Sequence, residues 1–201
     1  MGSVQDLMSL PHARWVLLAA AVALGFALSW LWRWYRVRHA RKVLRTTVVS
    51  IGADHLVDVL VPDGMGDGYH VDFLLLTVHG IVVIDMRQVH GNIFGGDQMA
   101  EWTVMDGPRR FTFINPQNGL YDRVAAVKAI AGDVPVEGRV VFAKGSRFPK
   151  GLPKWTVLID SLRAQFPSLE ADSEDGTLSS YREPWTRLKS AVTPSTMVHM
   201  R

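Results

Sequence analysis

Hydrophobic residues in this chain form one long run near the N-terminus and several short runs farther along. The long run, WVLLAAAVALGFALSWLW, extends from Trp15 to Trp32 without a charged residue. A helix of this length spans roughly 27 Å, close to the thickness of the hydrocarbon core of a bilayer. A buried core helix usually carries a polar stripe, and this run carries none. The pattern therefore predicts a transmembrane helix over residues 15–35, preceded by an N-terminal segment, residues 1–14.

Basic residues are distributed unevenly around this run. Arg14 precedes it, whereas six Lys and Arg residues follow it between residues 33 and 45. A secretory signal peptide has the opposite arrangement, with its positive charge before the apolar stretch. The positive-inside rule therefore predicts a single-pass membrane protein whose C-terminal part faces the cytoplasm, with a basic juxtamembrane helix over residues 36–46. Small residues recur at every fourth position, which suits a homodimer but also arises by chance in an alanine-rich helix.

Short apolar runs separated by turn residues follow, and this is the pattern of β-strands. HLVDVLVP (residues 55–62) predicts a first strand, and HVDFLLLTVHGIVVIDMRQVHG (70–91) predicts a hairpin of two strands. EWTVM and RRFTFI predict two more strands on either side of the turn Asp106-Gly107-Pro108. GRVVFA (138–143) predicts a later strand, and WTVLIDSLRAQF (155–166) predicts a further strand or a helix.

One helix is indicated between the last two groups of strands. Asn115 is suited to cap its N-terminus, Pro116 to its first position and Gly132 to its end. One apolar face would be formed by Leu120, Val124, Val127 and Ala131. This order of elements predicts an α/β domain over residues 47–166, with a helix packed on a central sheet. The polar remainder, residues 167–201, is predicted to be a flexible tail.

Three charged residues interrupt the apolar hairpin: Asp72, Asp85 and Arg87. If His79-Gly80 is a two-residue turn, Asp72 lies opposite Arg87, and Asp85 lies opposite Leu74. Because side chains alternate between the faces of a strand, the three charged side chains then project from the same face. Two carboxylates on one face can bind a divalent cation such as Mg²⁺ through their oxygen atoms. The other interpretation is that Asp72 and Asp85 lie on a solvent-facing side of the sheet, where Arg87 is their ion-pair partner.

Composition and charge exclude several kinds of site. The chain has no cysteine, which excludes disulfides and thiolate metal sites. The formal net charge is +3, but residues 46–201 contain more acidic than basic side chains, so bulk charge does not favour nucleic-acid binding there. His70, His79 and His90 lack the spacing of a zinc site. One basic run contains no acidic residue: Arg139, Lys144, Arg147, Lys150 and Lys154. We predict that these residues contact a phosphate backbone, and the alternative is that they are simply solvated.

The hairpin resembles a known enzyme pattern. Asp72, a turn and then IDMR are similar to the PD-(D/E)xK nuclease pattern, in which an Asp precedes an acid, any residue and a lysine. Together with Trp102 and NPQNGLYDRVAAVKAI, they make residues 47–166 similar to the nuclease-related domain (NERD) family. The resemblance implies a restriction-endonuclease-like α/β fold, a central mixed sheet with flanking helices, behind one transmembrane helix. It also implies Mg²⁺- or Mn²⁺-dependent phosphodiester hydrolysis at a bacterial inner membrane, with Asp72 and Asp85 as metal ligands and Arg87 in the lysine position.

Several positions depart from that pattern. Arg87 keeps the charge of the lysine but does not readily lose a proton. Asp85 is shorter than the usual glutamate, and Gly119 stands where the family tends to have a glutamine. Two functions therefore stay open: a membrane-anchored metal-dependent nuclease, or a catalytically inactive module that binds nucleic acid or a protein partner. A domain that only scaffolds a membrane assembly is a third alternative.

Overall fold

The computed structural model describes residues 11–66, 68–166 and 177–195, without the side chains of residues 11–14, 16, 17, 36–41 and 177. The chain forms two compact units, Met1–Arg45 and Thr46–Arg201. Part of the predicted N-terminal segment, residues 1–10, lies outside the described residues. Residues 167–176 and 196–201 of the predicted tail also lie outside them.

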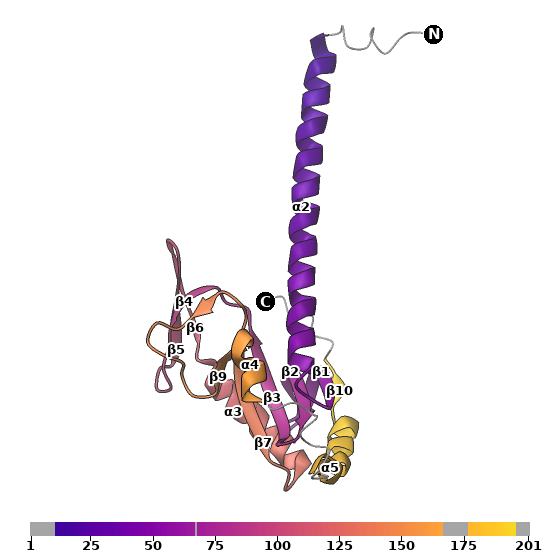
Figure 1. Cartoon of the computed structure of the whole chain (residues 1–201), viewed down its shortest axis with the longest axis vertical. Helices are drawn as coiled ribbons and strands as arrows, with labels where there is room; N and C mark the ends of the chain where they lie inside the picture. Colours follow the sequence, from indigo (N-terminus) through magenta and orange to yellow (C-terminus); the bar gives the residue numbers. More distant parts are fainter. Residues whose placement is uncertain (1–10, 67, 167–176, 196–201) are drawn as a thin grey trace, which may run out of the picture. The chain divides into compact units, whose positions relative to one another are not determined.

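Helix α2 accounts for the described part of the first unit (Figure 1). It extends over Pro11–Val49, 39 residues, which confirms that residues 36–46 are helical. All side chains from residue 18 to residue 35 are exposed, although most of them are apolar. Among the described residues, no helix is both long enough and apolar enough to cross a bilayer, so the predicted transmembrane helix is not confirmed.

Six strands form a mixed sheet in the second unit: β1 (Asp54–Pro62), β2 (Gly68–Thr77), β3 (Gly80–Arg87), β7 (Val136–Phe142), β9 (Thr156–Leu158) and β10 (Thr193–Pro194). Their order is β10-β1-β2-β3-β7-β9 (Figure 1). The strands are antiparallel from β10 to β3 and parallel from β3 to β9. A parallel pair needs a long crossover connection, and three strands of a second sheet and a helix lie between β3 and β7 in the sequence.

The hairpin of β2 and β3 turns at Val78 and His79, one residue earlier than predicted. Thr77 pairs with Gly80 across the turn. The hydroxyl of Thr77 donates a hydrogen bond to the carbonyl of Gly80 (3.0 Å) and accepts one from the amide of His79 (3.2 Å). These side-chain bonds close the turn at this position, and the pattern of apolar residues does not reveal them.

The strand register therefore differs from the predicted one by two residues. Leu74 pairs with Val83 and not with Asp85, and Asp72 does not lie opposite Arg87. A shift of two residues preserves the alternation of side chains, whereas a shift of one would reverse it. The predicted common face of the three charged residues is consequently retained, although the predicted partners are wrong.

A second mixed sheet consists of β4 (Gly91–Phe94), β5 (Glu101–Asp106), β6 (Arg109–Ile114) and β8 (Ser146–Arg147). Its order is β6-β5-β4-β8, so the strands predicted from EWTVM and RRFTFI are confirmed. Trp102 of this sheet is fully buried and stacks on Phe142 of β7, with ring centroids 6.0 Å apart. Trp102 therefore joins the cores of the two sheets.

Helix α3 (Pro116–Ala131) packs against β7 and begins as predicted. The side chain of Asn115 accepts a hydrogen bond from the amide of Gln117 (2.9 Å), and Gly132 ends the helix with φ of 73°. Leu120 and Val127 are buried on its apolar face. The segment 155–166, predicted to be a strand or a helix, contains both, because helix α4 (Ile159–Gln165) follows β9 directly.

Helix α5 (Thr177–Ala191) and β10 lie in the segment predicted to be a flexible tail, so this prediction is wrong for residues 177–195. Trp185 and Leu188 of α5 are buried in the core, and Tyr181 packs beside them. The indole of Trp185 donates a hydrogen bond to Asp54 (2.8 Å), which attaches α5 to β1. The apolar positions follow helical spacing, but the polar residues between them concealed the pattern.

Candidate functional site

Three aspartates form a row across neighbouring strands of the six-stranded sheet. The residue pairs on either side of Asp58 in β1 place it opposite Asp72 in β2. One step beyond the last paired residues of β2 and β3, Asp72 faces Asp85. Residues opposite each other in regular antiparallel strands have Cβ atoms about 5 Å apart, which applies to Asp72 and Asp85. Asp58 has a positive φ of 52°, and one of its carboxylate oxygens lies within 4.8 Å of a carboxylate oxygen of Asp72. The three carboxylates are therefore concentrated in a small region. Such a concentration of negative charge requires nearby positive groups or a cation.

Asp85 is deeply buried, with 2% of its side chain exposed. Its Oδ2 atom accepts a hydrogen bond from Nη2 of Arg87 (2.7 Å) and a longer one from Nη1 of Arg123 (3.4 Å), which extends from α3. The other oxygen, Oδ1, has no hydrogen-bond partner among the described residues. Two guanidinium groups thus compensate a charge that would be costly to bury alone.

Asp72 is held in place by the adjacent strand. Its Oδ2 atom accepts a hydrogen bond from the amide of Met86 (2.7 Å), and its Oδ1 atom lies 3.6 Å from Nδ1 of His70. The Nε2 atom of His70 lies 3.8 Å from Oδ1 of Asp58. The carbonyl of His70 accepts a hydrogen bond from Nε of Arg123. The imidazole therefore lies between two carboxylates, and one arginine contacts both this group and the buried ion pair.

The structure brings together the three residues predicted from the sequence, Asp72, Asp85 and Arg87. It adds three residues that sequence reasoning missed: Asp58, His70 and Arg123. His70 and Asp72 are two residues apart in a strand, and this spacing alone indicates a shared face. Asp58 and Arg123 come from other elements, so only strand pairing and helix packing bring them to the site.

The predicted phosphate-binding residues separate into two groups. Arg139 is bound to Glu137 (2.7 Å) and to the carbonyl of Gly138 (2.8 Å), so its guanidinium is engaged within the domain. The other four residues are exposed in the segment between β7 and β9: Lys144, Arg147, Lys150 and Lys154. These four remain available to solvent and to a polyanion.

Strand pairing connects Arg147 with a second exposed arginine. Arg147 of β8 pairs with Asn92, Asn92 pairs with Met105, and Met105 pairs with Arg110 of β6. All four side chains are exposed and lie in one row across the four-stranded sheet. With about 4.8 Å between strands, the two arginines at the ends of this row are roughly 14 Å apart along the sheet.

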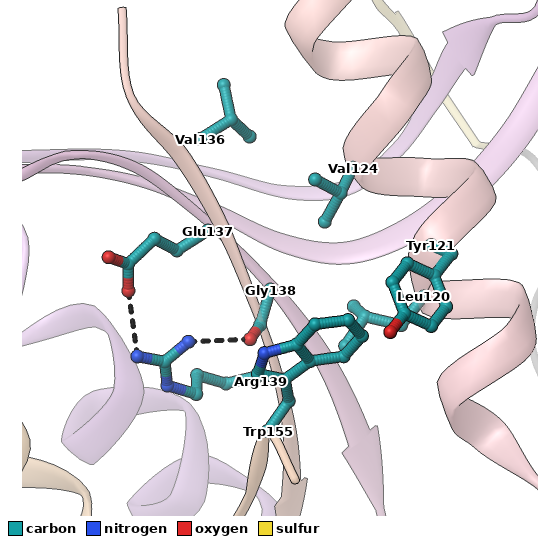
Figure 2. Close-up of a pocket in the computed structure, with 8 residues that line it drawn as sticks. All are labelled: Leu120, Tyr121, Val124, Val136, Glu137, Gly138, Arg139 and Trp155. Carbon is teal, nitrogen blue, oxygen red and sulfur yellow. Dashed lines mark hydrogen bonds and ion pairs between the residues drawn. The ribbon is translucent and has the colours of Figure 1, made fainter. Parts of the chain in front are cut away.

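A pocket of about 320 Å³ lies between α3 and the edge of β7 (Figure 2). Trp155 packs edge-to-face on Tyr121 at one wall, with ring centroids 4.2 Å apart, and it adopts a positive φ of 55°. The charged pair of Glu137 and Arg139 forms another wall, and the carboxylate row does not line the pocket. Its lining consists of Leu120, Tyr121, Val124, Val136, Glu137, Gly138, Arg139 and Trp155.

Comparison with known proteins adds one finding. The family model described as "Nuclease-related domain" matches residues 36–143, more than half of the chain. The chain belongs to the nuclease-related domain family. The match extends from within α2 to the residue after β7, so it includes the complete aspartate row. No curated protein and no solved structure matches the chain.

Placement of this nuclease-related domain in the PD-(D/E)xK superfamily is consistent with that match, and it implies a Mg²⁺ ion bound by Asp72 and Asp85. Mg²⁺ requires nearly octahedral oxygen ligands at about 2.0–2.1 Å. In this domain, Oδ2 of Asp85 is bound by Arg87 and Arg123, and Oδ2 of Asp72 is bound by a backbone amide. One oxygen of each carboxylate is thus engaged within the domain, and the two guanidinium groups at Asp85 oppose a further cation shared by the two carboxylates.

Proposed function

We propose that this chain is a nuclease-related domain that binds nucleic-acid phosphates and in which Asp85 no longer supports Mg²⁺-dependent hydrolysis. The observation that carries the proposal is the presence of two guanidinium groups on Oδ2 of Asp85. A guanidinium stays protonated in proteins, so Arg87 cannot accept a proton from an attacking water. The buried ion pair therefore stabilises the fold where the family pattern has a metal and a lysine.

The exposed cations support the binding half of the proposal. Arg110 and Arg147 lie at opposite edges of the four-stranded sheet, with polar Asn92 between them. Arg147 also belongs to the exposed basic segment between Lys144 and Lys154. Phosphate contacts of this kind come mainly from Arg, Lys and amide side chains and do not depend on base sequence. We therefore expect binding that is weakly sequence-specific and sensitive to salt.

A membrane anchor is the second part of the proposal. The exposed apolar side chains of α2, among them Leu24, Phe26 and Leu28, are unsuited to water and support insertion into lipid. The excess of basic residues after them supports a cytoplasmic position of the domain. The full chain is expected to stay in the membrane fraction after alkaline extraction, and Leu24→Arg with Leu28→Arg is expected to release it. Release of the unchanged chain would contradict the anchor.

Metal-dependent hydrolysis is the competing function, and one observation favours it. Oδ1 of Asp85 is buried and has no partner among the described residues, although buried polar atoms are normally satisfied. A domain that retains two carboxylates on one face also retains part of the nuclease pattern. Under this alternative, Arg87 would leave Asp85 when nucleic acid and metal bind.

Cleavage assays on the full chain separate these two functions. Labelled DNA and RNA would be incubated with Mg²⁺ or Mn²⁺ and with the unchanged chain, Asp85→Asn or Arg87→Lys. We expect no cleavage by the unchanged chain, because Arg87 occupies the carboxylate. Cleavage by the unchanged chain that disappears in Asp85→Asn would contradict the proposal and establish the nuclease.

Binding assays test the phosphate contacts separately. Replacing Arg110 and Arg147 by Gln is expected to weaken binding of DNA and RNA of any sequence and to lower the salt slope by about one for each arginine that no longer binds a phosphate. The matched control replaces two exposed cations elsewhere, Lys128 and Arg182, by Gln. Equal weakening in the control would show that only net charge matters and would remove the sheet face as the interface.

A further inference from the structure

Asp58, His70 and Asp72 form a ligand group next to the buried ion pair. One ligand atom from each side chain lies within 4.8 Å of the corresponding atoms of the other two. We propose that these three residues bind one divalent transition-metal ion, such as Zn²⁺. This site differs from the Mg²⁺ or Mn²⁺ site implied by the family because Asp85 is not a ligand in it and a histidine is.

Hydrogen bonds from neighbouring segments already hold all three ligand residues. Asp72 directs Oδ1 toward His70 because the amide of Met86 binds its Oδ2 atom. Arg123 holds the carbonyl of His70, which fixes the strand at that residue. Asp58 is held from the other side, because its carbonyl accepts a hydrogen bond from the amide of Ser195 (2.8 Å). Preorganised ligands reduce the conformational cost of binding an ion.

The charge balance around the group points to a cation. Arg87 and Arg123 both bind Asp85, whose Oδ1 atom still has no partner among the described residues. Asp58 and Asp72 add two further negative charges, separated by a single imidazole. With a neutral His70, these side chains carry three negative and two positive charges, so the group as a whole attracts a cation.

The donor types favour a transition metal over Mg²⁺. Mg²⁺ and Mn²⁺ prefer oxygen ligands, whereas imidazole nitrogen suits Zn²⁺ and similar ions. His70 can offer one nitrogen to the ion while the other nitrogen stays near a carboxylate, as is common for metal-bound histidines. Three protein ligands also leave at least one coordination position for water or a phosphate oxygen.

The alternative explanation of the same distances is a protonated His70 that forms ion pairs with both aspartates. In that case a proton on each ring nitrogen would face a carboxylate, and no metal would bind. The metal proposal does not rest on the proposed phosphate binding or on the absence of hydrolysis, since it concerns the binding of an ion. Its test therefore measures ion binding alone.

The test titrates Zn²⁺ and then Mn²⁺ into the full chain by calorimetry, in parallel with thermal melting. We expect one Zn²⁺ per chain and a higher melting temperature with the ion. His70→Gln and Asp58→Asn are each expected to weaken binding by at least about tenfold and to remove the rise in melting temperature. The matched controls are His55→Gln, an exposed histidine of the same strand as Asp58, and Asp106→Asn at the exposed end of β5.

Loss of binding in both ligand variants with retention in both controls supports the proposal. No binding, or equal binding in all five chains, would overturn it and favour the protonated histidine. A second measurement needs no variant: the imidazole resonances of His70 in the unchanged chain should shift on addition of Zn²⁺, whereas those of His55 should not. An unshifted His70 would overturn the proposal even if a variant misfolds.

Discussion

The carboxylate of Asp85 and the guanidinium of Arg87 form a 2.7 Å ion pair between residues on the same face of one strand. The acid is 2% exposed and the arginine 19%, so the pair is largely shielded from water. Shielding strengthens the attraction between the charges, but it also makes each charge expensive without the other. The pair therefore occupies the position of the nuclease pattern and is a structural element of this sheet.

Removing Arg87 should destabilise the fold more than removing an exposed arginine. Arg87→Met is expected to lower the free energy of unfolding by about 3 kcal/mol, since Asp85 keeps only the longer contact with Arg123. Asp85→Asn in the same chain should recover part of this loss. Urea denaturation measures both, with exposed Arg147→Met as the control. If Arg87→Met and the control lose the same unfolding free energy, water screens the ion pair of Asp85 and Arg87.

Asp54 should make the fold sensitive to acid. Partial burial acts to raise the pKa of Asp54, but hydrogen bonds from Trp185 and Lys189 outweigh it, and the pKa is lower than usual. A carboxylate with a lowered pKa in the folded state contributes its stability above its unfolded pKa of about 4 and loses it as the pH falls through the lower folded value.

Asp54→Asn tests this dependence. At pH 7 it is expected to cost about 1 kcal/mol of unfolding free energy, a value reduced because the group is partly exposed. The difference from the unchanged chain should shrink as the pH falls below about 4. Denaturation curves at several pH values measure it, with Asp106→Asn as the control. A difference that does not depend on pH would show that the charge is not responsible.

Leu188 tests whether α5 belongs to the domain. Its side chain is fully buried, so Leu188→Ala should lower the free energy of unfolding by about 2–5 kcal/mol through weaker packing and a cavity. Leu152→Ala removes the same atoms from a side chain that is 48% exposed and should cost much less. Thermal or urea unfolding measures both losses. Equally small losses for the two variants would show that α5 does not contribute to the stability of the domain.

Gly80 should not tolerate a side chain. It has φ of 119°, and a Cβ atom there would lie 2.2 Å from the carbonyl oxygen of Pro135. Gly80→Ala is expected to cost about 3 kcal/mol or more, because an unfavourable backbone conformation and a backbone clash add together. Gly64→Ala is the control, since Gly64 has φ of 80° but open space around its Cβ position. It should cost only about 1 kcal/mol, and equal losses would exclude the clash as the cause.

The amino-acid sequence by itself determined the local elements of this protein. Short apolar runs predicted β1, β5, β6 and β7. A strand with one buried face has apolar residues at every second position, and a strand with both faces buried has a short continuous apolar run. Asn115 and Gly132 predicted the ends of α3, since capping depends on residues that are adjacent in the chain. The common face of Asp72, Asp85 and Arg87 also followed from the sequence. A register shift of two residues leaves each side chain on the same face of the sheet.

Tertiary structure decided which charges meet. The register of β2 and β3 depended on hydrogen bonds of the Thr77 side chain, which no hydrophobic pattern encodes. Arg123 reaches Asp85 only because α3 packs on the sheet, and Asp58 meets His70 only because β1 pairs with β2. Local patterns report which face a side chain occupies. Its partners across strands and helices depend on packing between segments that are distant in the sequence. Asp58 and Arg123 therefore emerged only from the fold.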